Sequence, residues 1–170
     1  MKLVEDFNLP INSYSIIVIC IIRDEELLIP AFLNHYRKLS ATHFIFIDNG
    51  SEDGSLDYLN AKAAEFNIQI WQTKESYAEN MYGVLWVNRI LNLQCQNKWC
   101  LVVDIDEFIL AKDGETMKDI RGSMIDSETN ILQTLLIDFY PKNFSNSHYK
   151  QHDNPFFHSC CFDKFSSDST

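Results

Sequence analysis

The sequence predicts an α/β protein built on a mainly parallel sheet flanked by helices. Short apolar runs rich in β-branched residues alternate with segments whose apolar residues recur at helical spacing, and this alternation is typical of parallel sheets. The run IIVICII at 16–22 is apolar on both faces, as expected of a strand in the middle of such a sheet. Because 170 residues suffice for one core, we expect 1–170 to form a single domain.

The other elements follow in order along the chain. A helix is expected to begin near Leu28–Ala31, because Pro30 is tolerated only in a first helical turn. Leu56, Leu59, Ala63 and Phe66 mark one face of a second helix, with Asp53 placed to cap it. Further strands are expected at 43–47, 68–71, 99–103 and 131–137, further helices at 76–94 (long and buried) and 115–122, and an irregular tail at 142–170.

Composition excludes some partners. Twenty-four acidic and fourteen basic residues leave a net charge of −10, which argues against binding nucleic acid or an anionic membrane through bulk charge. The longest apolar run, 16–22, is far shorter than the ~20 residues that span a bilayer, and the N-terminus lacks the features of a signal peptide. Five cysteines without a CxxC pair favour free thiols in a cytoplasmic protein.

Carboxylates follow two of the expected strands. Asp48 ends HFIFID, and DIDE at 104–107 follows WCLVV. Residues i and i+2 of an extended segment point to the same side, so Asp104 and Asp106 can share one ligand, and two carboxylates suit Mg²⁺ or Mn²⁺. The alternative is an acidic strand end that caps a helix or is simply solvated. Since an acidic protein that binds a phosphorylated molecule needs a cation, we favour the metal.

Two other acidic stretches allow several interpretations. DNGSEDG at 48–54 starts like a calcium loop, but its twelfth position is Asn60 rather than Glu and a strand precedes it. It can also be a turn with a helix cap, or a loop whose Asp48 accepts hydrogen bonds from a base or ribose. RDEE at 23–26 is either a phosphate and ribose site or a solvated helix start. His35 and His43 are expected to be structural, whereas one of the tail histidines can complete a metal site.

Several stretches together resemble a known family. They are CIIRDEELLIPAFLNHYRKLSATHFIFIDNGSEDGSLDYL, YGVLWVNRIL and WCLVVDIDEFIL. Their combination is similar to the family 2-like glycosyltransferases of bacteria, in the subgroup that also resembles the eukaryotic family 92 enzymes. Asp24 stands where that pattern has Asn. The resemblance covers about 15–141 and implies a Rossmann-like GT-A fold, a nucleotide-diphospho-sugar donor (most simply a UDP-sugar), a saccharide or glycolipid acceptor and inversion of stereochemistry.

The resemblance also implies roles for individual residues. Asp104 and Asp106 would bind Mn²⁺ or Mg²⁺ at the catalytic centre, with Asp104 near the ribose. The nucleotide would lie against Arg23, Asp24, Glu25, Asp48, Asn49, Gly83 and Asn88. Trp86 is a further candidate, although we favour a core position for it. The setting implied is polysaccharide assembly in the cytoplasm, with peripheral attachment to the inner membrane left open.

The pattern is incomplete at its C-terminal end. In family 2 enzymes the carboxylate that deprotonates the acceptor lies well beyond the DxD. In this chain Asp138, Asp153 and Asp163 are available there, but none of them sits in a motif. We therefore expect a donor-binding half more firmly than a complete enzyme, and a catalytically inactive donor-binding fragment is the first alternative. A two-aspartate phosphatase is the second, disfavoured because that chemistry requires a DxD after the first strand and a Thr or Val where Phe108 stands.

Overall fold

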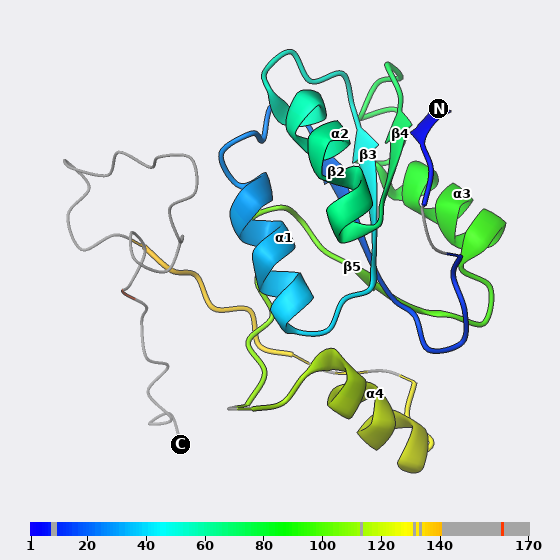
Figure 1. The fold of residues 1–170 in the computed structure, drawn as a ribbon, viewed down its shortest axis with the longest axis vertical. Coiled ribbons are helices and arrows are strands. Elements are labelled where there is room, and N and C mark those ends of the chain that lie inside the picture. The colour runs from blue at the N-terminus through cyan, green and yellow to red at the C-terminus, as the bar shows by residue number, and fades with distance from the viewer. Residues whose placement is uncertain (8–9, 113, 131, 133, 141–160, 162–170) are drawn as a thin grey trace.

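The computed structural model describes residues 1–7, 10–112, 114–130, 132, 134–140 and 161. It contains a five-stranded sheet with helices on both faces (Figure 1). The elements are β1 (Lys2–Glu5), β2 (Ile16–Ile22), α1 (Ile29–Lys38), β3 (His43–Asp48), α2 (Ser55–Phe66), β4 (Ile68–Gln72), α3 (Val84–Gln94), β5 (Trp99–Val102) and α4 (Met117–Asp126). The predicted α/β class with a mainly parallel sheet is confirmed.

The sheet has the order β1-β4-β3-β2-β5. β2 pairs in parallel with both β3 and β5, and β3 pairs in parallel with β4, whereas β1 is an antiparallel edge strand beside β4. The four parallel strands therefore end at one edge of the sheet. The register sets Asp48 beside Gln72 of β4 and beside Ile22 of β2 at that edge.

Two apolar layers hold the helices on the sheet. Alternate residues of β2 and β3 point to opposite faces: Val18 and Phe46 belong to the layer under α1 and α2, and Ile19 and Ile47 to the layer under α3. The buried faces of the helices complete each layer, including Phe32, Leu33 and Tyr36 of α1, Leu59 and Ala63 of α2, and Trp86, Val87 and Ile90 of α3. The core is thus a helix–sheet–helix sandwich, which leaves the strand ends to form a site.

Helix starts were predicted with mixed success. α1 has Pro30 in its first turn, as expected. The N-cap of α2 is Gly54 rather than Asp53, although Asp53 still accepts a hydrogen bond from the N–H of Ser55 at 2.9 Å. α4 spans Met117–Asp126 rather than 115–122, because Thr116 and Asp119 form a capping box that fixes its start.

Two predicted elements were wrong in extent or kind, and one strand was missed. The helix expected at 76–94 begins only at Val84, because Met81, Tyr82 and Gly83 all have left-handed backbone angles that a helix excludes. Val84, Leu85 and Leu93 of this helix are exposed rather than buried. The strand expected at 131–137 is not formed by residues 132 and 134–137, where Leu132, Leu135 and Leu136 are exposed. The edge strand β1, in contrast, was not predicted. The predicted tail at 142–170 lies outside the described residues, save Cys161.

Other features agree with the sequence. Among the described residues, no helix is long and apolar enough to cross a membrane. The four cysteines that the structure describes, Cys20, Cys95, Cys100 and Cys161, are all free thiols.

Candidate functional site

A cavity of about 390 Å³ opens where the strand order reverses. β3 and β4 lie on one side of β2, and β5 lies on its other side, so the chain connections diverge above the end of β2. Open α/β sheets bind ligands at such a point. The lining comes from the end of β2 and the following loop, from the loops after β3 and β4, and from the segment after β5: Ile21, Ile22, Arg23, Glu25, Leu28, Asn49, Tyr77, Asp104, Ile105 and Asp106. We call this space the acidic cavity.

Asp104 and Asp106 both line the acidic cavity. The last backbone bond to the sheet runs from the N–H of Val103 to the carbonyl of Ile19 at 3.2 Å. Beyond it, Ile105 is buried while the aspartates on either side of it are exposed. The two carboxylates therefore line one cavity, although residues 104–107 form a turn, closed by the bond from the N–H of Glu107 to the carbonyl of Asp104, rather than the extended segment that the prediction assumed.

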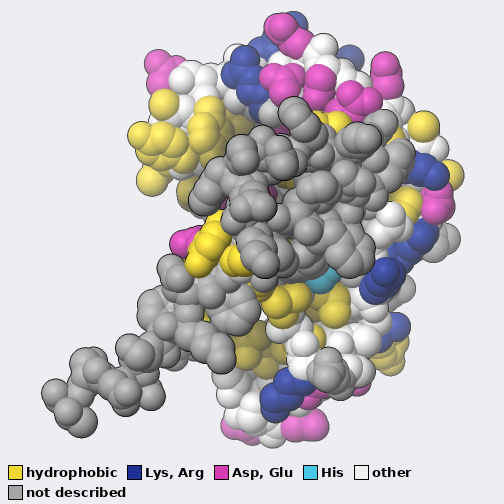
Figure 2. All heavy atoms as spheres, turned by 90° about the vertical axis from the view of Figure 1, so that its left-hand side faces the viewer, with side chains coloured by type: hydrophobic (Ala, Val, Ile, Leu, Met, Phe, Trp, Pro, Cys, Tyr) yellow, Lys and Arg dark blue, Asp and Glu magenta, His cyan; other side chains and the backbone are white. Residues whose placement is uncertain are grey.

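The charge of the acidic cavity is mainly negative. Burial raises the pKa of Asp104, and the neighbouring Glu107 and Asp106 carboxylates raise it further. Burial likewise raises the pKa of Glu25, with Asp106 as its strongest charged neighbour. These carboxylates disfavour one another's charge, and a bound cation would relieve that repulsion. Figure 2 shows the acidic side chains gathered at the upper end of the molecule, where Figure 1 places the loops after β3 and β4.

The residues present fit a cation that shares its ligands with a phosphate. Within the described part of the chain, no group of three or more His, Cys, Asp or Glu side chains is arranged to hold a metal. Asp104 and Asp106 alone supply the one or two carboxylates with which proteins hold Mg²⁺ when substrate phosphates and water complete the shell. Two carboxylates are too few ligands to hold a metal ion by themselves. They suit a metal ion whose other ligands are water and the phosphates of a nucleotide.

The loop after β2 is fixed to the loop after β3. Asp24, in a left-handed conformation, donates its N–H to Ser51 Oγ at 3.0 Å and accepts the N–H of Glu52 at 2.7 Å. The N–H of Glu25 bonds Ser55 Oγ at 2.8 Å. Arg23, whose side chain is 64% exposed, has Asp24 at 3.9 Å. Arg23 and Glu25 line the acidic cavity, whereas the contacts of Asp24 join the two loops.

Asp48 and Asn49 organise the strand edge. Asp48 is fully buried, and its carboxylate accepts the N–H groups of Gly50 and Ser51 and the amide of Gln72 at 3.1–3.3 Å. Asn49 Nδ2 donates to the carbonyls of Thr73 and Glu75 at 3.4 and 3.1 Å. Asn49 thereby ties the loop after β3 to the loop after β4, and it also lines the acidic cavity.

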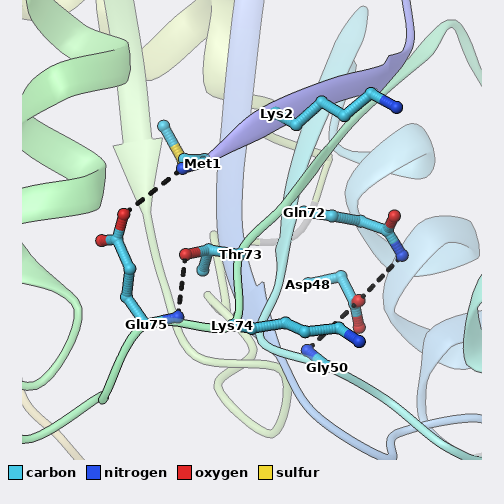
Figure 3. Close-up of a pocket in the computed structure, with 8 residues that line it drawn as sticks. All are labelled: Met1, Lys2, Asp48, Gly50, Gln72, Thr73, Lys74 and Glu75. Carbon is cyan, nitrogen blue, oxygen red and sulfur yellow. Dashed lines mark hydrogen bonds and ion pairs between the residues drawn. The ribbon is translucent and has the colours of Figure 1, made fainter.

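A second cavity, of about 490 Å³, is lined by residues at the ends of β3 and β4 and by the start of the chain at β1. Figure 3 shows its lining of Met1, Lys2, Asp48, Gly50, Gln72, Thr73, Lys74 and Glu75. In that view the Lys74 side chain extends toward Asp48 and Gly50, and Lys2 lies on the β1 side. We call this space the Lys74 cavity. It combines two lysines with the hydrogen-bonding groups of Gln72 and Thr73 and the carboxylates of Asp48 and Glu75.

Three predicted nucleotide contacts line neither cavity: Asp24, which joins the two loops, Gly83 and Asn88. Gly83 is buried at the start of α3 with φ +83°, and a Cβ there would meet Ile21 and the Tyr77 ring. Asn88 is exposed on α3. Trp86 is 2% exposed and donates its indole N–H to Glu75 at 2.9 Å, so it occupies the core position that we favoured.

The other interpretations of these stretches have structural answers. The stretch 48–54 joins β3 to α2, a strand–loop–helix arrangement that is not an EF-hand. His35 donates from Nε2 to the carbonyl of Ile109 at 2.9 Å, and His43 is buried beside Thr42 and Phe7. Both histidines are structural, as predicted. His148, His152 and His158, like Asp153 and Asp163, lie outside the described residues, and Asp138 is exposed.

Sequence reasoning missed several lining residues. Tyr77 walls the acidic cavity, and Gln72, Thr73 and Lys74 wall the Lys74 cavity. The rule that drew attention to Asp48 also applies to β4, because polar residues directly after a parallel strand reach the same edge. No such rule pointed to Tyr77, because the sequence pattern placed it inside the helix expected at 76–94.

The comparisons with known proteins concern the fold. No family model matches the chain, and no curated protein matches it. Among solved structures it is similar to the crystal structure of residues 1–349 of S. aureus TarS, a glycosyltransferase, with 16% sequence identity and a TM-score of 0.53. The likeness covers 76% of this chain and 41% of the TarS chain. The fold is therefore glycosyltransferase-like, and the chain spans about two fifths of the length of that structure.

Proposed function

We propose that this chain binds a nucleotide-diphospho-sugar together with a divalent cation, as the donor-binding part of a glycosyltransferase. The observation that carries the proposal is the convergence of Asp104, Asp106, Glu25 and Arg23 on one cavity at the switch point of a glycosyltransferase-like sheet. A UDP-sugar is the donor that we expect, and a saccharide or glycolipid hydroxyl is the acceptor.

The two cavities suit different parts of the donor. Asp104 and Asp106 would hold Mn²⁺ or Mg²⁺ beside the diphosphate, and Arg23 lines the same cavity, where its guanidinium can bond phosphate oxygens. The cation, when bound, supplies Lewis-acid stabilisation of the departing nucleoside diphosphate. The nucleoside would enter the Lys74 cavity, where Lys74 and Thr73 can contact it. Because loop amides already occupy the Asp48 carboxylate, we assign Asp48 mainly to shaping this cavity.

Membership of the family 2-like group, inversion of stereochemistry and a role in polysaccharide assembly remain part of this proposal. They are supported by the sequence motifs and by the glycosyltransferase-like fold. Asp138 is the described aspartate that lies beyond the DxD and was considered as a base, and its side chain is exposed. We assign it no role.

A second candidate function is donor binding without turnover. It uses the same site, and the glycosyltransferase-like fold does not favour it over the first candidate. Both candidates predict nucleotide binding, and only the first predicts sugar transfer. The phosphatase alternative is not favoured, because the aspartate pair follows β5, the last strand of the described sheet, in a glycosyltransferase-like fold.

Calorimetric titration with UDP, with and without Mn²⁺, tests the donor site. We expect binding that requires Mn²⁺ and that weakens at least about 100-fold in Asp106→Ala, because a hard divalent cation held by two carboxylates loses one of them. Asp126→Asn, which removes an exposed carboxylate at the end of α4, is the matched control and should bind as the wild type does. Equal affinity with and without the metal, or an unchanged Asp106→Ala variant, would refute the proposed site.

A further inference from the structure

The segment that carries the aspartates is held by side chains of α1. After Val103 its backbone makes no further bond to the sheet among the described hydrogen bonds. Its carbonyl and N–H groups at Glu107 and Ile109 instead bond Tyr36 and His35, which lie next to each other on α1. We call residues 104–109 the acidic turn.

Tyr36 makes two of these bonds through one hydroxyl. The hydroxyl donates to the carbonyl of Glu107 at 2.8 Å and accepts the N–H of Ile109 at 3.3 Å. The side chain is fully buried, so the position of the hydroxyl is fixed by packing. Burial raises the pKa of Tyr36 to about 12, which keeps the hydroxyl protonated and able to donate.

Aromatic packing supports the same contact. The Phe108 ring of the acidic turn lies edge-on to His35 at 5.1 Å and to Phe32 at 6.4 Å, measured between ring centroids. Tyr36 in turn lies 4.7 Å from Phe32 and 5.0 Å from His35. Pairs at such distances add to the energy of burial. Phe32, His35 and Tyr36 of α1 therefore all contact the acidic turn.

The bonds to α1 are linked to the carboxylates through the turn itself. The N–H of Glu107 donates to the carbonyl of Asp104 at 3.1 Å, and the N–H of Asp104 donates to Glu107 Oε2 at 3.1 Å. Asp106 lies inside this closed loop. Anchoring Glu107 thus limits how far Asp104 and Asp106 can move relative to Arg23 and Glu25, which line the same cavity.

We infer that Tyr36, assisted by His35, is a positioning residue that fixes the acidic turn so that Asp104 and Asp106 can bind the metal–nucleotide complex. The inference rests on the proposed function for the ligand, but the fixing of the turn is independent of it. A site with only two carboxylates needs them held in place, because affinity depends on pre-organisation.

The test combines hydrogen exchange with calorimetry on Tyr36→Phe, which removes the hydroxyl and keeps the ring. We expect amide exchange in 104–109 to accelerate about tenfold, and Mn²⁺-dependent UDP affinity to fall about tenfold, at a temperature where the variant is fully folded. Leu59→Val, on α2 in the same apolar layer, is the control: it should lower the melting temperature without changing exchange in 104–109 or UDP affinity.

The possible results separate the inference from the function. Unchanged exchange in 104–109 would overturn the inference whatever the ligand proves to be. Faster exchange with unchanged UDP affinity would also overturn it, by reducing Tyr36 to a structural role. If the wild type binds no UDP, the proposed function fails, while exchange in Tyr36→Phe still decides whether the hydroxyl fixes the turn.

Discussion

His35 connects the stability of the fold to pH. Its ring is half-buried, and burial lowers its pKa below the ordinary value, with the nearby Lys38 acting in the same direction and the bond to the carbonyl of Ile109 opposing them. Because the folded-state pKa lies below that of the unfolded chain, the unfolded chain takes up the proton more readily. The neutral ring therefore contributes stability that is fully present above the unfolded pKa, near 6.5, and is lost as the pH falls through the folded value.

We predict that His35→Gln flattens this part of the stability profile. The Gln amide can donate to Ile109 without titrating, so the variant should lose less stability than the wild type between pH 7.5 and 5.5. For one proton, linkage limits the extra slope of the wild type to about 1.4 kcal/mol per pH unit. Urea unfolding at a series of pH values measures it, and carboxylates that titrate in both proteins cancel in the difference. Parallel profiles would contradict a lowered pKa of His35 in the folded state, because the folded and unfolded chains would then bind its proton equally.

Asp48 shows what sequence reasoning can and cannot determine about a single residue. Its place at a strand end was predictable, because the apolar run before it marks a parallel strand. The use of its carboxylate was not, since the three groups that bond it come from Gly50, Ser51 and Gln72, the last of them 24 residues away. Asp104 and Asp106 were easier to place, because both come directly after an apolar strand and line one cavity, although the backbone between them is a turn rather than extended.

At the scale of elements, backbone geometry accounts for the largest error. The apolar residues in 76–94 have helical spacing, but three consecutive left-handed residues, 81–83, stop the helix before Val84. Only Gly83 among them favours that conformation, so composition gave little warning. β1 was missed because an edge strand of four residues has too short a pattern to distinguish from a loop.

Gly83 is predicted to be the residue in this region that tolerates substitution least. Gly83→Ala meets a left-handed φ and also Ile21 and, at 3.0 Å, the Tyr77 ring. Gly114 has a similar φ of +82°, and an added Cβ would have nothing within 4 Å. The loss of stability in Gly114→Ala therefore measures the cost of the left-handed backbone alone. We expect about 1 kcal/mol of destabilisation for Gly114→Ala and about 1–3 kcal/mol more for Gly83→Ala. Chemical denaturation followed by circular dichroism provides the comparison, and equal losses would contradict the packing argument.

For the whole molecule, the net charge of −10 makes the location of its cations informative. Arg23 lines the acidic cavity, and Lys2 and Lys74 line the neighbouring one. An anionic ligand that spans both cavities meets these cations, but it also meets Glu25, Asp104 and Asp106. We therefore expect nucleotide and metal each to bind weakly alone. The nucleotide alone is repelled by the carboxylates, and the metal alone leaves the cationic side chains without an anionic partner.

This coupling predicts a thermal shift that neither ligand produces alone. Mn²⁺ without nucleotide finds two carboxylates and no third protein ligand among the described residues, and UDP without metal faces those carboxylates directly. Together, at about 100 times the dissociation constant, they should add about 2.7 kcal/mol of stability, or about 5–10 °C in melting temperature for a domain of this size. EDTA should reverse the shift, and Asp106→Ala should lack it. A full shift with Mn²⁺ alone would instead indicate a complete metal site, and a full shift with UDP alone would show that the Arg23 and Lys74 walls suffice to bind the nucleotide without a cation.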